Sequence, residues 1–255
     1  FAERARGGVG MIITGGISPN LEGGLGAKLS TSEEASKHKL VTDAVHEADP
    51  DVKICMQILH MGSLAHTKTA VAPSAVRSRI ARHVPNELDE EGIEKQLNDM
   101  ANCAQKAKEA GYDGVEIIGS AGYLLSTFLV EKTNQRDDQW GGSYENRMRF
   151  PVECVRRIRK AVGDNFIVIF RIAAMDMLEG GMSWDEIVLL LVIVLLLYLV
   201  SLYFFPVMPP QLFPLKDRRY KTTNCVRVNL DGYLQIIEAI NKYFLMNNCR
   251  DILVF

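Results

Sequence analysis

Four short apolar runs, separated by longer segments with helical periodicity, constrain the fold of this chain more than any other feature. The runs cover residues 9–14, 52–59, 114–118 and 166–172. They are rich in β-branched residues and do not alternate cleanly with polar ones, which is typical of parallel strands covered on both faces. The repeated order of strand and helix therefore predicts an α/β fold.

Capping signals and an apolar stripe mark the first helices between the runs. One helix is expected over residues 33–48, and a second begins after Asp89 and stops at Gly111. The inward-facing stripe of the second helix consists of Ile93, Leu97, Met100, Ala104 and Ala107.

Two further helices are expected later in the pattern. Ser143 is expected to cap the first of them, and Pro151 either kinks that helix or marks its true start. Ser183 and Glu186 have the spacing of a capping box, which predicts that another helix opens there.

Two architectures fit this order of elements. A (β/α)8 TIM barrel needs ~250 residues, and here about four βα units already occupy the first 186 residues. The barrel interpretation therefore predicts an incomplete barrel. A doubly wound sheet is the alternative, but its GxGxxG fingerprint does not follow the first run, where the chain reads GGIS at residues 15–18.

Composition changes abruptly after Glu186. The chain has a formal net charge of -2, of which -5 belongs to residues 1–186 and +3 to the last 69 residues. Nineteen of the 20 glycines precede this boundary. We therefore divide the chain into a partial barrel, residues 1–187, and an unassigned C-terminal tail, residues 188–255.

The tail opens with an apolar run over residues 187–205, and no charged residue occurs before Lys216. Its length is sufficient to span a membrane, for which ~20 apolar residues are needed. It could instead be a buried barrel helix, although such a helix is usually apolar on one side only. The third interpretation is translated sequence of non-homologous origin, and the loss of Gly and Ala favours it.

Charge and cysteine spacing narrow the function classes. The near-neutral charge gives no electrostatic argument for nucleic-acid binding. Five widely spaced cysteines without a CxxC pair argue against a disulfide framework and a closed zinc site, so no metal ligands are assigned. The first residues do not have the pattern of a secretory signal, and we expect them to lie inside a longer chain.

Candidate functional residues lie at the ends of the predicted strands, where parallel barrels place their active sites. Gly15 and Gly16 would let a flat ligand approach the backbone, or they form a plain tight turn. Gln57 offers both a donor and an acceptor to the edge of a ring. His60 follows it, and a hydrogen-bonded histidine at a strand end is the interpretation we favour there.

Two more candidates follow the third and fourth runs. Tyr123 could donate a proton, or it could be an aromatic side chain packed on its loop. Arg171 lies within an apolar strand, where a guanidinium requires an anion. That anion could belong to a ligand, or to an internal carboxylate such as Glu116 or Asp176.

The motifs of the first part of the chain resemble those of the Old Yellow Enzyme family of FMN-dependent oxidoreductases. They are similar above all to the barrel domain of NADPH-dependent 2,4-dienoyl-CoA reductases. The matching stretches are AERARGGVGMIITGG (2–16), QILHMG (57–62), VAPS (71–74), AGYDGVEIIGSAGYLL (110–125), TNQR (133–136) and WGGSYENRMRFP (140–151). The resemblance runs in family order over residues 1–187.

The resemblance implies a role for each candidate. Gly16 would place its backbone near the flavin ring, Gln57 would bind the pyrimidine edge of FMN, and Arg171 would stabilise negative charge on reduced flavin. Tyr123 would protonate the substrate carbon after hydride transfer. NADPH would supply the electrons.

Departures from the family pattern also matter. Ile118 and Ala121 stand where many members carry a histidine pair, or histidine and asparagine, that holds the substrate carbonyl. An enoyl or dienoyl thioester is therefore expected as substrate rather than a simple enone. The family's later strands, iron–sulfur cysteines and FAD module find no counterpart in the sequence.

The sequence leaves three hypotheses open. The chain is an ene-reductase, a catalytically inactive remnant, or a protein anchored in a membrane through residues 187–205. The family implies a cytoplasmic or mitochondrial location, and the apolar run would imply a membrane location.

Overall fold

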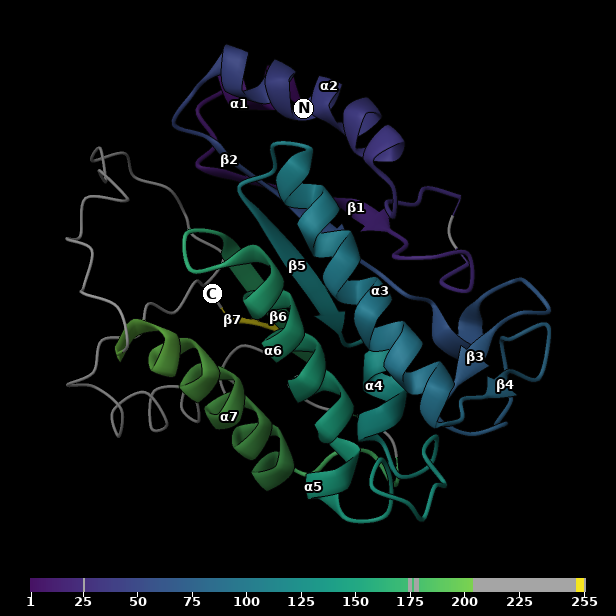
Figure 1. The fold of residues 1–255 in the computed structure, drawn as a ribbon. Helices are drawn as coiled ribbons and strands as arrows, with labels where there is room; N and C mark the ends of the chain where they lie inside the picture. Colours follow the sequence, from purple (N-terminus) through teal and green to yellow (C-terminus); the bar gives the residue numbers. More distant parts are fainter. Residues whose placement is uncertain (25, 174–175, 177–178, 204–250, 255) are drawn as a thin grey trace.

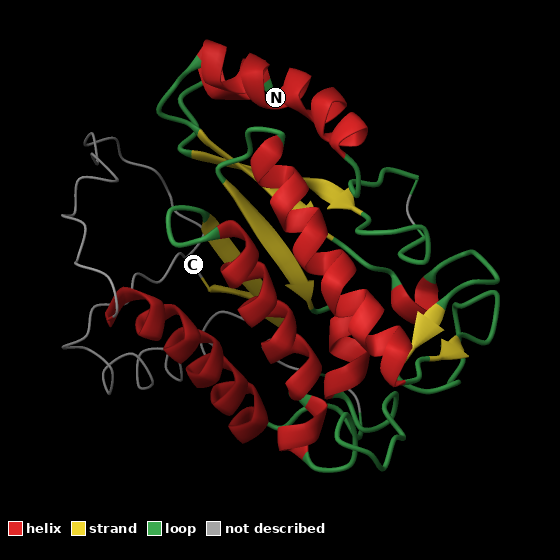
Figure 2. Cartoon of the chain, in the orientation of Figure 1, coloured by secondary structure: helices red, strands yellow, loops and turns green. Residues whose placement is uncertain are grey.

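The computed structural model describes residues 1–24, 26–173, 176, 179–203 and 251–254. Within them, four parallel strands form the centre of the molecule, and helices cover one face of the sheet (Figures 1 and 2). The strand order β1-β2-β5-β6 follows the order of the chain. A doubly wound sheet reverses its direction at a switch point, whereas a barrel adds each strand on the same side. The order therefore confirms an incomplete barrel.

Each central strand lies where an apolar run predicted one. The strands are β1 (Met11–Ile17), β2 (Lys53–Ile58), β5 (Gly114–Gly119) and β6 (Ile167–Ala173). β1 is displaced toward the C-terminus relative to the prediction, because it continues through its two glycines to Ile17. The glycines thus lie inside the strand, and the expectation that they end it was wrong.

The helices agree closely with the capping signals. They are α1 (Ala2–Arg6), α2 (Ser32–Ala48), α3 (Glu90–Glu109), α4 (Leu124–Leu129), α5 (Tyr144–Arg147), α6 (Arg149–Val162) and α7 (Trp184–Tyr203). Asp89 caps α3 by accepting a hydrogen bond from the Gly92 amide at 2.7 Å. All five residues of the predicted α3 stripe are fully buried. The loop after β2 contains a 3-10 helix, η1 (Gly62–Leu64), and two short paired strands, β3 (Val71–Ala72) and β4 (Asn86–Glu87).

The helix expected after Ser143 is divided into two. Ser143 caps only the short α5, and α6 begins at Arg149, which places Pro151 in its first turn. Proline is tolerated there because the first amides of a helix have no intrahelical acceptor. The capping box before α7 is present, since the Ser183 amide donates to Glu186 at 2.7 Å and the Glu186 amide donates to the Ser183 hydroxyl at 3.3 Å.

The two faces of the central sheet differ in chemistry. Successive strand residues point to opposite faces, and those facing the helices join the hydrophobic core. They include Ile54, Met56, Ile58, Val115, Ile117, Val168, Phe170 and Ile172. The opposite face, which would be the inside of a closed barrel, carries the polar side chains of Gln57, Glu116 and Arg171. The sheet therefore concentrates its polar groups on the face that no described helix covers (Figure 1).

The start of the apolar run packs as a barrel helix. Ile187, Leu190, Leu191 and Val194 of α7 are buried at helical spacing, and α7 lies against α6 (Figure 1). Across the described part of the chain, no helix combines the length and apolar character needed to cross a membrane. The last two residues of the 187–205 run lie outside the described residues.

One strand of the tail was not predicted. β7 (Asp251–Val254) pairs antiparallel with β6, with Asp251 opposite Ala173 and Val254 opposite Phe170. Residues 233–244 of the tail, which have a weakly amphipathic sequence, lie outside the described residues.

Candidate active site

A buried carboxylate joins the polar side chains of three neighbouring strands. Gln57 of β2 lies directly opposite Glu116 of β5, and the Gln57 Nε2 donates to Glu116 Oε1 at 2.8 Å. Arg171 Nε of β6 lies 3.4 Å from the same oxygen. Glu116 is fully buried, whereas the Arg171 side chain is 33% exposed. The carboxylate thus fixes an amide and a guanidinium side by side at the carboxyl ends of the strands.

An irregularity in β1 fixes the backbone next to Gln57. The register with β2 shifts between Ile13 and Gly16. Thr14 supplies hydrogen bonds where the strand ladder is interrupted. Its hydroxyl accepts from the backbone amide of Gln57 at 3.1 Å and donates to the Gly15 carbonyl at 2.9 Å. Such a bulge re-aims neighbouring residues and is common beside active sites. Thr14 could not be recognised from the sequence, since nothing in an apolar run marks a bulge.

The two glycines of β1 have different surroundings. A Cβ on Gly16 would come within 2.8 Å of the Leu59 side chain and 3.3 Å of Gln57 Oε1, so close packing inside the protein requires glycine there. A Cβ on Gly15 would meet nothing within 4 Å. Gly15 is therefore the position at which the backbone is open to an approaching ligand.

Arg171 forms the internal ion pair with Glu116 that was considered from the sequence, and its side chain is 33% exposed. Binding of a ligand anion by Arg171 stays a prediction. Asp176, the other carboxylate considered, instead accepts a hydrogen bond from the Met182 amide at 3.0 Å.

Tyr123 follows β5 through a short loop of unusual backbone conformation. Ala121 and Gly122 have φ values of 63° and 75°, a left-handed conformation that is strained for alanine. The chain then turns into α4, and the Tyr123 carbonyl accepts hydrogen bonds from the Thr127 amide and the Ser126 hydroxyl. The partly exposed phenol forms no hydrogen bond within the described part of the chain. Tyr123 is therefore held by its backbone, with its hydroxyl available to a ligand.

His60 is a hydrogen-bonded core histidine, as the favoured interpretation predicted. Its Nδ1 accepts from the Gly62 amide at 3.0 Å, so Nε2 carries the proton and donates to Gln96 Oε1 at 3.1 Å. Complete burial lowers the pKa of His60 to about 4. The His60 carbonyl accepts from the Leu124 amide at 3.0 Å, which ties the end of β2 to the residue after Tyr123.

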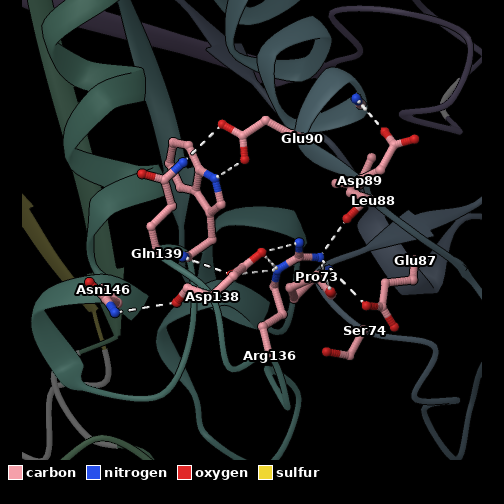
Figure 3. A network of polar contacts seen from close by, with 12 residues as sticks. Pro73, Ser74, Glu87, Leu88, Asp89, Glu90, Arg136, Asp138, Gln139 and Asn146 are labelled. Atoms are coloured by element: carbon pink, nitrogen blue, oxygen red, sulfur yellow. Dashed lines mark hydrogen bonds and ion pairs between the residues drawn. The ribbon is translucent and has the colours of Figure 1, made fainter.

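The TNQR and WGGSYENRMRFP stretches contribute to a structural clamp. Arg136 forms a paired contact with Asp138 and donates to the carbonyls of Pro73 and Leu88 at 2.9 and 2.5 Å (Figure 3). The Trp140 indole donates to Glu90 at 2.8 Å. These bonds fasten the loop after α4 to both ends of the loop between β3 and β4.

The described cysteines are buried thiols. Cys55, Cys103 and Cys154 are free, and burial raises the pKa of Cys55 and of Cys154 to about 12. None of them is a reactive thiolate at neutral pH. The described residues contain no group of three or more His, Cys, Asp or Glu side chains arranged to hold a metal ion.

Comparison with known proteins finds relatives that are reductases and oxidases. A sequence model of the NADH:flavin oxidoreductase / NADH oxidase family matches residues 1–195, which extends eight residues beyond the expected end of the resemblance. A metal reductase of Desulforamulus reducens is 39% identical over 192 residues, covering 73% of this chain and 28% of the relative. An NADH oxidase of Thermoanaerobacter brockii is 36% identical, covering 73% of this chain and 30% of the relative.

Solved structures agree in fold. A 2-naphthoyl-CoA reductase in complex with 2-naphthoyl-CoA superimposes with a TM-score of 0.69 at 31% identity, covering 76% of this chain and 32% of that one. Morphinone reductase in complex with tetrahydroNAD gives 0.63 at 30% identity, covering 71% and 56%.

These matches define the class of protein: an α/β chain with the TIM-barrel architecture of flavin-linked oxidoreductases. The chain belongs to the NADH:flavin oxidoreductase / NADH oxidase family, which includes the Old Yellow Enzyme-like alkene reductases. It spans less than a third of the length of the curated relatives described above.

Proposed function

We propose that this chain carries part of the FMN site and the proton donor of an oxidoreductase that reduces an activated carbon–carbon double bond. The observation that carries the proposal is the Gln57–Glu116–Arg171 row across three neighbouring strands, in which Gln57 and Arg171 lie in the second halves of their strands. FMN is the cofactor of the family, and it supplies hydride to substrates when it is bound.

The residues present fit the pyrimidine edge of a flavin. That edge alternates hydrogen-bond acceptors and a donor, and an amide beside a guanidinium offers the complementary groups. Gln57 would bind this edge, and Arg171 would place positive charge against it. The open backbone at Gly15, with Gly16 beside it, would allow a flat ring to approach the strand.

Tyr123 would donate the phenol proton to the substrate carbon next to the carbonyl. Its position after β5 supports this role, as does its hydroxyl, which forms no hydrogen bond to any of the described residues. Removing one hydrogen bond donor from such a site typically costs ~10²–10⁴ in rate.

The substrate we favour is an enoyl or dienoyl thioester of the kind that 2,4-dienoyl-CoA reductases use, with NADPH or NADH as reductant. Two observations support a thioester. Many members of the family hold the substrate carbonyl with polar side chains at the positions of Ile118 and Ala121. Ile118 is buried and apolar here, and Ala121 has no hydrogen-bonding side chain. A structural relative is a reductase of 2-naphthoyl-CoA.

The test compares Tyr123→Phe with Tyr112→Phe. Tyr112 is a buried phenol bonded to His38 at 3.0 Å on the helix side of the sheet, so its variant controls for loss of a hydroxyl. FMN-loaded protein is assayed with NADPH and an α,β-unsaturated acyl-CoA. We expect Tyr123→Phe to lose reduction but keep its flavin, and Tyr112→Phe to keep both. Equal activity in the two variants would contradict the assignment, and inactivity of the unmodified chain would favour the alternative of an inactive remnant.

A further inference from the structure

One stretch of the chain concentrates positive charge without any acid. Residues 52–86 contain no Asp or Glu, although residues 1–186 as a whole have a net charge of -5. The cations at the far end of this stretch are Lys68, Arg77, Arg79 and Arg82. We refer to residues 68–84 as the basic loop.

The part of the chain that the structure describes does not neutralise the charges of the basic loop. All four cationic side chains are exposed, and none takes part in an ion pair among the residues that the structure describes. Other arginines are paired, including Arg136 with Asp138 and Arg157 with Glu94. Like charges repel one another, and a bound anion would offset that repulsion within the loop.

The basic loop lies on the active-site side of the sheet. β3, which lies within the loop, and β4, which follows it, lie beyond the arrowheads of β1 and β5 (Figure 1). β3 also contacts α4, the helix that follows Tyr123. Ligands of parallel α/β proteins bind at this end of the strands. The loop is thus placed to contact the distal part of a substrate whose reactive part reaches Tyr123.

The base of the loop is rigid. Arg136 donates to the carbonyl of Pro73, within the loop, and to the carbonyl of Leu88, just after β4 (Figure 3). The Ser74 hydroxyl accepts from the Gln135 backbone amide at 2.9 Å. A rigid base reduces the entropy lost when a loop binds a ligand.

From this placement we propose that the basic loop binds a nucleotide that carries a ribose phosphomonoester and a pyrophosphate. The inference rests on the proposed function, because both candidate ligands of that reaction have this chemistry: the CoA portion of a thioester substrate, and NADPH. The phosphates of either carry about four negative charges at neutral pH, which matches the four cations of the loop. Ile80, which is 77% exposed between the arginines, offers an apolar contact to the purine.

The test is calorimetric titration of the 255-residue chain with CoA, 3′-dephospho-CoA, NADPH and NADH. The loop variant is Arg77→Gln/Arg79→Gln/Arg82→Gln. The matched control is Arg4→Gln/Arg6→Gln/Lys160→Gln, which removes the same charge from exposed sites on α1 and α6.

We expect the loop variant to weaken binding of the phosphomonoester ligand by about tenfold, since each exposed charge contact contributes a few-fold. The loop variant should also lose the preference for CoA over 3′-dephospho-CoA, or for NADPH over NADH. The pair whose preference is lost shows whether the loop binds the CoA portion of the substrate or NADPH. The control variant should bind like the unmodified chain.

Three results would overturn the inference: no saturable binding of CoA or NADPH by the unmodified chain, equal weakening in the two triple variants, or no preference for the phosphomonoester. The proposed function has its own tests, which are the retention of flavin and the activity of Tyr123→Phe. A chain that retains FMN and reduces a simple enone, yet fails these titrations, would keep the proposed function and lose only the inference about the basic loop.

Discussion

Gln57 and Glu116 face each other across neighbouring strands, and the Gln57 amide donates to the buried carboxylate at 2.8 Å. Because Nε2 of the Gln57 side chain points to Glu116, Oε1 points away from it, toward β1. A Cβ added to Gly16 would lie 3.3 Å from this oxygen. Since Arg171 approaches the same carboxylate oxygen, Glu116 orients two candidate ligand-binding groups at once.

Removing the carboxylate should therefore destabilise the sheet. Glu116→Ala leaves the half-buried side-chain amide of Gln57 and the guanidinium of Arg171 without their shared acceptor. We expect this to cost about 2 kcal/mol of unfolding free energy. Urea denaturation measures this value. Glu116→Gln, which keeps the shape, should cost less. An alanine variant within about 0.5 kcal/mol of the unmodified chain would show that the carboxylate does not organise the row.

The Arg136 clamp predicts that lysine cannot replace arginine there. Arg136 combines a paired carboxylate contact with two carbonyl acceptors, and a lysine cannot reproduce that fork. We expect Arg136→Lys to lose about 2 kcal/mol in thermal or urea unfolding. Arg156→Lys is the control, since exposed Arg156 pairs with Glu153 on α6 and should change stability by less than about 0.5 kcal/mol. Similar losses in both variants would contradict the clamp.

His60 predicts a loss of stability in mild acid. Burial lowers its pKa from 6.5 to about 4, so the unfolded chain binds a proton between these pH values and the folded chain does not. Stability contributed by the neutral imidazole is present above pH 6.5, falls as the pH is lowered toward 4, and does not fall further below that. The loss amounts to about 3 kcal/mol.

The measurement is the urea midpoint between these two pH values. A His60→Asn variant should have a flatter profile over that window, even if it is less stable throughout. An unchanged slope would show that other groups cause the acid sensitivity.

The loop before Tyr123 predicts a stabilising substitution. Ala121 is exposed and has a φ of 63°, which costs an alanine about 1 kcal/mol. Ala121→Gly should remove that strain and raise the unfolding free energy by up to about 1 kcal/mol, less the entropy of a freer unfolded chain. Ala75→Gly, at an exposed position without a positive φ, should not stabilise. Destabilisation by Ala121→Gly would mean that the left-handed loop is not strained.

Much of the fold could be predicted because local signals and tertiary structure agree. The apolar runs, the Asp89 cap and the Ser183–Glu186 capping box each depend on neighbouring residues, and each is present. The strand order could not be read from spacing alone, since it depends on which helix packs on which side of the sheet.

The candidate site was predicted in part. Gln57 and Arg171 were found because polar residues in an apolar strand require partners, and the structure brings them to one carboxylate. Glu116 was considered only as an internal partner of Arg171, although it too is a charge in a buried strand. Thr14 and Gln96 gave no signal, because a bulge and a contact between distant elements leave no local pattern.

The apolar run shows why periodicity alone was insufficient. Residues 187–205 are apolar all round, so the sequence does not show which side faces inward. The core beneath α7 selects Ile187, Leu190, Leu191 and Val194, and the family match likewise continues through them to residue 195.

The most direct test of the account is retention of FMN by the purified chain after gel filtration, read from the visible absorbance of the flavin. The account predicts that the unmodified chain retains flavin and that Gln57→Leu and Arg171→Leu retain much less. Gln139→Leu, which removes an exposed amide bonded to Glu90 at the start of α3, should retain as much flavin as the unmodified chain. Flavin lost equally from all four proteins, or retained equally by all four, would contradict the assignment of the Gln57–Glu116–Arg171 row as the cofactor site.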